Sequence, residues 1–134
     1  MTRVKALIGV ICLSLLMAAC APVQPKREYV QRDDLKVDPE IRQSVQVQEL
    51  LDKRVSLPNG GSLLRIQFSV QAYQDTDMEW AVTWFDEDGM VVPGVGEGYR
   101  PVRILRDQTR FFTATAPQEK AVSYQLHLRE DRAP

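Results

Sequence analysis

The sequence has few of the side chains that most often carry chemistry. Its 134 residues include two cysteines and one histidine. Both cysteines, Cys12 and Cys20, lie near the N-terminus, so the rest of the chain has no thiol for a disulfide, a zinc site or a nucleophile. His127 alternates with Ser123 and Arg129 in a strand-like pattern, which predicts a solvated side chain. We therefore expect no catalytic residue, no metal site and no cofactor, and hence no enzyme.

An excess of charge of one sign is also missing. Lys and Arg number 17 and Asp and Glu 18, for a net charge of −1. Without a basic excess the chain has no electrostatic reason to bind nucleic acid. The glycine-rich stretch "GVGEG", residues 94–98, lacks the Lys-Ser/Thr pair of a phosphate-binding loop and precedes no helix pattern, so it predicts a mobile loop.

The apolar run near the N-terminus is too short to span a membrane as a helix. It extends from Ala6 to Leu16, about eleven residues, against the roughly 20 that spanning requires. Arg3 and Lys5 precede it and "LMAAC" follows it, which resembles a secretory signal peptide that ends in a bacterial lipobox. This resemblance predicts that residues 1–19 are cleaved and that Cys20 becomes the lipidated first residue.

The lipid anchor predicts where the protein lies. A thiolate is a good nucleophile for taking up a diacylglyceryl group, and several acyl chains anchor a protein far more firmly than one. Ala21, rather than aspartate, follows Cys20, which indicates sorting to the outer membrane with the domain facing the periplasm. Residues 20–43 contain several prolines and mixed charge and predict a flexible linker, with a turn or short helical start at Asp38-Pro39.

The remaining residues, 44–130, alternate with the period of β-strands. In "LLRIQFSVQAY" every second residue from Leu64 to Ala72 is apolar. Turn-forming stretches such as "PNGG" separate several segments of this kind, and no helical period interrupts them. The pattern predicts an all-β fold, an immunoglobulin-like antiparallel β-sandwich of about seven strands. The predicted strands are 44–51, 63–73, 78–85, 90–93, 100–105, 109–115 and 121–128.

An acidic corner, Asp86-Glu87-Asp88-Gly89, separates two of the predicted strands. These are the residues of a tight hairpin, with Gly89 in the left-handed position after a type I turn. A calcium loop of the EF-hand type needs alternating ligands and a later glutamate, which this stretch does not have. Paired catalytic carboxylates need to face each other across a cleft. We interpret the corner as a turn rather than as a metal or catalytic site.

Aromatic residues make up 7% of the chain, and its two tryptophans are the candidates for contact with a ligand or partner. Trp80 and Trp84 share one strand face with Val82, which predicts that they lie in the core of the sandwich. The alternatives are a platform on which a glycan stacks and a protein interface. A further candidate is a set of four arginines: Arg100, Arg103, Arg106 and Arg110. We interpret them as charges that block edge-to-edge pairing of strands. The alternative is a basic edge that binds a partner.

Three stretches together resemble the YcfL-type family of small bacterial lipoproteins: "GSLLRIQFSVQAY", "VTWFDEDGMVV", and "YRPVRILRDQTRFFTATAP" with the later "YQLHL". The resemblance covers about residues 44–129 and is most recognisable at the hairpin from Thr83 to Gly89. Gln71-Ala72-Tyr73 departs from it, since such proteins often have an asparagine before the turn. The resemblance implies a periplasm-facing immunoglobulin-like sandwich, and it implies no established activity or catalytic residues.

These observations lead to one expectation for function and three alternatives. We expect a non-enzymatic lipoprotein, held to the outer membrane through Cys20, that binds an envelope protein as an accessory module, with a free strand edge as the docking surface. One alternative is a peptidoglycan- or glycan-binding module that uses Trp80 or Trp84. A second is a lipoprotein component of a secretion-type envelope complex, and a third is a hydrolase that uses His127.

Overall fold

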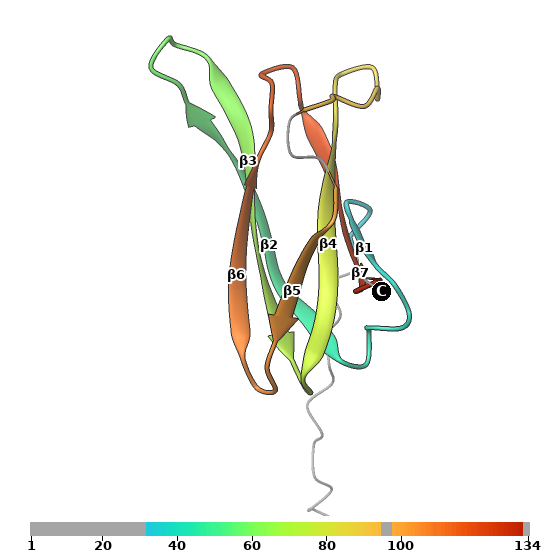
Figure 1. Ribbon diagram of the computed structural model, residues 1–134. Coiled ribbons are helices and arrows are strands. Elements are labelled where there is room, and N and C mark those ends of the chain that lie inside the picture. Colours follow the sequence, from blue (N-terminus) through green and yellow to red (C-terminus); the bar gives the residue numbers. More distant parts are fainter. Residues whose placement is uncertain (1–31, 95–97, 133–134) are drawn as a thin grey trace, which may run out of the picture.

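The computed structural model describes residues 32–94 and 98–132, which form two β-sheets packed face to face (Figure 1). One sheet has the strand order β1-β7-β4-β5 and the other β2-β3-β6. No helix, and so none that could cross a membrane, occurs among these residues. The predicted all-β sandwich of about seven strands is confirmed. The strands are β1 (Leu35–Val37), β2 (Val45–Ser56), β3 (Ser62–Ala72), β4 (Thr76–Phe85), β5 (Arg100–Ile104), β6 (Thr109–Thr115) and β7 (Ser123–Glu130).

The apolar face of the strands points into the space between the two sheets. In β3, Ile66, Phe68 and Val70 are fully buried, whereas Gln67 between them faces solvent. Leu126 and Leu128 of β7 are fully buried from the opposite sheet. A large apolar side chain contributes about 1.5–3 kcal/mol when it leaves water. The alternation that predicts these strands is therefore also what holds the sheets together.

β2 is longer than its sequence indicates. The predicted strand 44–51 continues to Ser56 in its pairing with β3, with a register shift between Val47 and Glu49. Beyond Leu50 the side chains of β2 are mostly exposed, so no apolar alternation marks this half. Among the described strands β3 is its only ladder partner, and Arg54 Nη2 also donates to the Ala121 carbonyl at 2.9 Å. In Figure 1 this end of the β2–β3 hairpin projects away from the other strands.

The folded domain begins before residue 44. Residues 35–37, which the sequence placed in a flexible linker, form β1 and pair parallel with β7, and Ile41 is buried in the core. The turn expected at Asp38 is present, since the Ile41 N–H donates to the Asp38 carbonyl. A three-residue edge strand has no alternation that a sequence pattern can reveal, because its partner decides its pairing. The described end of the predicted linker therefore belongs to the sandwich.

The return strand predicted over residues 90–93 is reduced to a single bridge, between Phe85 and Val91. The Val92 N–H donates to the Trp84 carbonyl at 2.8 Å, and the Val92 side chain is fully buried. Pro93 follows and has no N–H to donate, so the ladder cannot continue through it. One buried residue, rather than a strand, fastens this segment to β4.

Arg32 fastens the first described residues to the sandwich. Its Nη1 donates to the Leu50 carbonyl at 2.7 Å, its Nε donates to Asp34 at 2.8 Å, and its Nη2 lies 3.4 Å from the Tyr124 hydroxyl. Burial, and after it the Asp34 carboxylate, raises the pKa of Tyr124 to about 12, so this hydroxyl is protonated at neutral pH. The chain thus enters the domain across the edge of β2.

Candidate functional site

The acidic corner at residues 86–89 is a turn, as interpreted from the sequence. The Asp86 carboxylate accepts hydrogen bonds from the N–H groups of Asp88 and Met90, both at 2.9 Å, and Gly89 has φ 78°. A carboxylate bonded in this way closes its own turn and does not face a second carboxylate. In residues 32–94 and 98–132, no group of three or more His, Cys, Asp and Glu side chains could hold a metal ion.

Trp80 and Trp84 lie in the core, as their alternation predicts. They are 5% and 6% exposed, and the Trp80 ring meets Phe68 edge-on at 5.0 Å between ring centroids. A cleft of about 60 Å³ adjoins both tryptophans beside Arg100, whose guanidinium lies 5.0 Å from the centre of the Trp80 ring. Ligand pockets usually enclose roughly 300–1,000 Å³. The cleft is therefore much smaller than an ordinary ligand pocket.

His127 is not solvated, so this prediction is wrong. Its side chain is 19% exposed, with Nε2 2.7 Å from Asp38 Oδ1 and Nδ1 2.6 Å from the Tyr99 hydroxyl. A carboxylate only accepts, so Nε2 donates to Asp38, and in the neutral ring Nδ1 accepts from Tyr99. The hydrogen bond from His127 lowers the pKa of Asp38. The alternation correctly placed His127 on the outer face of β7, but residues distant in the sequence, Asp38 and Tyr99, shield its side chain from solvent there.

Two further charges complete this cluster on the outer face of the four-stranded sheet. Arg129 Nε donates to Glu79 Oε1 at 2.5 Å, and the Arg129 guanidinium lies 3.3 Å from the centre of the Tyr99 ring. Among the described residues, the lining of the cleft beside Trp80 includes neither His127 nor Tyr99. These contacts join β7 to Glu79 of β4, to Asp38 directly after β1 and to Tyr99 directly before β5.

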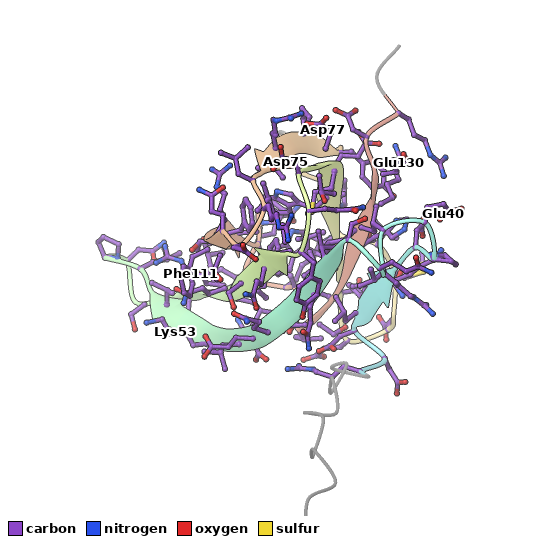
Figure 2. The ribbon with its side chains drawn as sticks, turned by 90° about the horizontal axis from the view of Figure 1, so that it is seen from below. Glu40, Lys53, Asp75, Asp77, Phe111 and Glu130 are labelled. Carbon is purple, nitrogen blue, oxygen red and sulfur yellow. The ribbon has the colours of Figure 1, made fainter. Side chains whose placement is uncertain are left out.

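Of the four predicted arginines, Arg100 and Arg103 lie on β5, Arg106 in the turn after it and Arg110 on β6. Arg103 Nη1 donates to Asp77 at 2.8 Å, Arg103 also lies 3.8 Å from Asp75, and Arg106 lies 3.8 Å from Asp107. Figure 2 shows Asp75 and Asp77 near one another at this edge. Exposed pairs of this kind contribute about 0–1 kcal/mol, and they offset the charges of Arg103 and Arg106. The guanidinium groups of Arg100 and Arg110 lie over the rings of Trp80 and Phe112. The arrangement supports the interpretation as edge charges over a basic binding edge.

Three of the four outer edges of the sheets carry a feature that discourages pairing with another chain. β1 has three residues. β5 contains Pro101, which has no N–H to donate. On β2, the Arg32 side chain occupies the Leu50 carbonyl. Short strands, prolines and charges are the usual protections of a sheet edge, and β2 also carries the charged residues Glu49, Asp52, Lys53 and Arg54.

β6 is the edge strand without these protections. Its seven residues, TRFFTAT, contain one charge and no proline, and β3 is its only hydrogen-bonded neighbour among the described strands. At its two ends, Gln108 accepts from the Ala72 N–H and Ala116 donates to the Leu64 carbonyl. Even-numbered residues therefore bond to β3, because ladder bonds alternate along a strand.

The odd-numbered residues of β6 consequently direct their N–H and C=O groups away from the sheet. We call this set the open edge: Thr109, Phe111, Thr113 and Thr115. The side chain of Phe111 is 64% exposed, and Figure 2 places it at the outside of the molecule. No other strand among residues 32–94 and 98–132 pairs with this row of donors and acceptors, and such a row beside an exposed aromatic ring can accept a further strand.

The sequence located β6 correctly but not its exposure. Residues 109–115 were predicted as a strand with the bounds the structure shows. Phe111 and Phe112 are adjacent, and neighbouring residues of a strand point to opposite faces. One of the two rings therefore has to leave the core, which is the signal in the sequence that could have indicated Phe111.

Several predictions fall wholly or partly on residues outside those that the structure describes, including residues 20–31 of the predicted linker. The cleavage of residues 1–19 and the lipidation of Cys20 lie there entirely. Of the loop predicted over residues 94–98, Gly94 and Gly98 are described and residues 95–97 are not.

Comparison with known proteins places the sandwich among related folds. Residues 38–130 match the family model described as "Protein of unknown function (DUF1425)". The structure of Campylobacter jejuni cj0090 is similar with a TM-score of 0.60 at 20% identity, covering 75% of this chain and 100% of that one. A DUF1425 family member from Shewanella sp. pv-4 has a TM-score of 0.55 at 22% identity, covering 67% and 81% of the two chains. No curated protein matches the sequence. At these identities the likeness shows the fold alone.

Proposed function

The chain belongs to the DUF1425 family of proteins of unknown function, and we propose that it is a non-enzymatic, YcfL-type outer-membrane lipoprotein that binds an extended protein segment in the envelope. The observation that carries this proposal is the open edge of β6, with its outward N–H and C=O groups and its exposed Phe111. The YcfL-type resemblance of the sequence is compatible with the family match.

Strand addition suits this surface because the main chain supplies the affinity. Each new backbone hydrogen bond contributes about 0.5–1.5 kcal/mol net, and the open edge offers an N–H and a C=O at each of its residues. Phe111 adds an apolar contact for a side chain of the incoming strand. Threonines occupy the rest of the outward positions, so β-branched residues already hold the edge extended.

The proposed lipid anchor sets the distance at which the domain works. Arg32 is bonded to the edge of β2, so the tether is the stretch between Cys20 and Arg32. At about 3.3 Å per residue these twelve residues extend at most about 40 Å. The open edge would then meet proteins that lie within a few nanometres of the outer membrane. Cys20→Ala is expected to move the protein from the membrane fraction to the soluble fraction.

The glycan-binding alternative has less support. It needs a tryptophan face that a sugar can reach, and Trp80 and Trp84 are 5% and 6% exposed. Their neighbouring cleft of about 60 Å³ is a fraction of an ordinary ligand pocket.

The test is a proline that blocks the open edge without touching the fold. The Thr113 N–H points away from β3, so Thr113→Pro removes an outward donor while the ladder to β3 keeps its bonds. A photocrosslinking p-benzoylphenylalanine at position 111 of the full-length protein reports the neighbours of the edge in cells. We expect a protein adduct that Thr113→Pro abolishes and Thr113→Ala preserves.

Position 83 provides the matched control for the crosslinker. Thr83 is an exposed strand residue on the outer face of the other sheet. Equal adducts from positions 83 and 111, or adducts at 111 that persist with Thr113→Pro, would contradict binding at the open edge.

A further inference from the structure

We infer that the strand that adds to the open edge is β6 of a second copy of this chain, antiparallel about a two-fold axis that passes between the two Phe112 residues. This inference rests on the proposed function, because it names the partner of the same edge. The product is a continuous six-stranded sheet in the order β2-β3-β6-β6-β3-β2, with the four-stranded sheets of both copies packed on one face of it.

The main chain of β6 selects this register. With Phe112 opposite its own copy, Thr109 faces Thr115 and Phe111 faces Thr113, so every residue of the open edge pairs with another residue of the open edge. The two symmetric registers on either side do not allow this. One brings Thr115 opposite Asp107, which has φ 62° and lies in a turn. The other brings Thr109 opposite Pro117, which has no N–H.

The outer face of this pairing covers the exposed aromatic ring. Phe111 of one copy lies opposite Thr113 of the other, which makes the two Phe111 rings diagonal neighbours on the same face. A ring that is 64% exposed in the single chain thereby gains an aromatic neighbour across the axis. Diagonal neighbours lie within reach of aromatic side chains, and aromatic pairs are favourable beyond the area that they bury.

The side chains of β6 that face the core, and the one charge on this strand, are also compatible with this register. Phe112 is partly buried, stacks on Phe68 at 5.0 Å between ring centroids, and would meet its own copy across the axis. Arg110 is the only charged residue of β6 and would lie opposite Ala114, so no like charges face each other. On β2, four charged residues and the Leu50 carbonyl that Arg32 occupies give that strand no comparable way to pair with itself.

The experiment uses two versions of the full-length protein, each with a different tag, expressed together in the native membrane. Both versions carry p-benzoylphenylalanine at position 111. We expect an adduct of twice the mass of the chain that contains both tags and joins position 111 to the neighbourhood of residue 113. Thr113→Pro in both versions is expected to abolish this adduct, and Thr113→Ala to preserve it.

A cysteine pair measures the register independently. Phe112→Cys brings two thiols to directly opposite positions, where the Cα atoms of a strand pair are about 4.5–5.5 Å apart and a disulfide forms. In Ala114→Cys the two thiols are offset by about four residues, roughly 13 Å, and no disulfide is expected. Ala114→Cys is the control for exposure to the oxidant, and crosslinking from position 111 does not depend on either substitution.

The outcomes separate the two proposals. The two-tag adduct supports both the second copy and the proposed function. An adduct that joins position 111 to a different protein overturns the second copy and leaves the proposed function standing. Absence of any protein adduct overturns both. If the two-tag adduct forms but the disulfide appears in Ala114→Cys and not in Phe112→Cys, the register is overturned.

Discussion

Trp80→Ala tests whether the tryptophans hold the fold or serve a ligand. Trp80 is 5% exposed, meets Phe68 edge-on at 5.0 Å and lies 5.6 Å from Phe112 between ring centroids. Truncation of such a ring removes its transfer free energy and leaves a cavity that the two sheets cannot fully close. The expected loss in the free energy of unfolding is about 3–5 kcal/mol. For a domain of this size, a loss of about 4 kcal/mol lowers Tm by roughly 16–32 °C.

Urea unfolding, followed by the fluorescence of Trp84, measures this loss. Phe111→Ala is the matched control, because an aromatic ring that is 64% exposed contributes little to the single chain. Its free energy of unfolding is expected to change by no more than about 0.5 kcal/mol when measured at a concentration at which the protein is monomeric. A loss below about 1 kcal/mol for Trp80→Ala, together with lost binding to purified sacculi, would refute the core assignment and favour a glycan platform.

Four further predictions follow from individual contacts. The hydrogen bond from His127 lowers the pKa of Asp38, so it stabilises the fold above the ordinary aspartate pKa of about 4, and this contribution disappears as the pH falls through the lowered pKa. In Asp38→Asn the free energy of unfolding should therefore fall less steeply as the pH is lowered. An unchanged dependence on pH would count against a stabilising role of this hydrogen bond. Thr113→Pro should cost less than about 1 kcal/mol, whereas Ala114→Pro, which removes a donor to β3 and leaves its acceptor unpaired, should cost about 1–3 kcal/mol more. Equal losses in thermal melts would contradict the assigned ladder. Arg32→Ala should cost about 1 kcal/mol, because the arginine side chain is 37% exposed, and should open new protease cleavage before residue 38; an unchanged digestion pattern would show that Arg32 does not fasten this segment. Gly89→Ala places a side chain at φ 78° and should cost about 1 kcal/mol in the same melts, and no loss would argue against this turn geometry.

The sequence was most informative where one residue faces the core and the next faces water. β3 and β6 are found within a residue or two of their predicted bounds, and Trp80 and Trp84 lie in the core that their spacing indicates. The predictions failed where a contact with a distant segment decides the structure. β1 has three residues and takes its conformation from β7. His127 faces outward as predicted, but Tyr99 and Asp38 cover it.

The candidate site at β6 was also only partly predictable from the sequence. A pair of adjacent phenylalanines in a strand requires that one of them leave the core, and this follows from the alternation of side chains alone. Which strands become edges does not follow from any local pattern. β2 and β6 are both edges, yet one is charged and bonded to Arg32 and the other presents a row of unprotected donors and acceptors.

From the sequence alone, the β-sandwich and most of the alternating residues that fill its core, as in β3 and β7, could be predicted. These properties depend on composition and on side-chain alternation, and both are local. The tertiary structure alone decided that β1 joins the domain, that His127 is enclosed, and that β6 is the edge left open. Each of these depends on which strands become neighbours, and that choice is made by the packing of the two sheets as a whole.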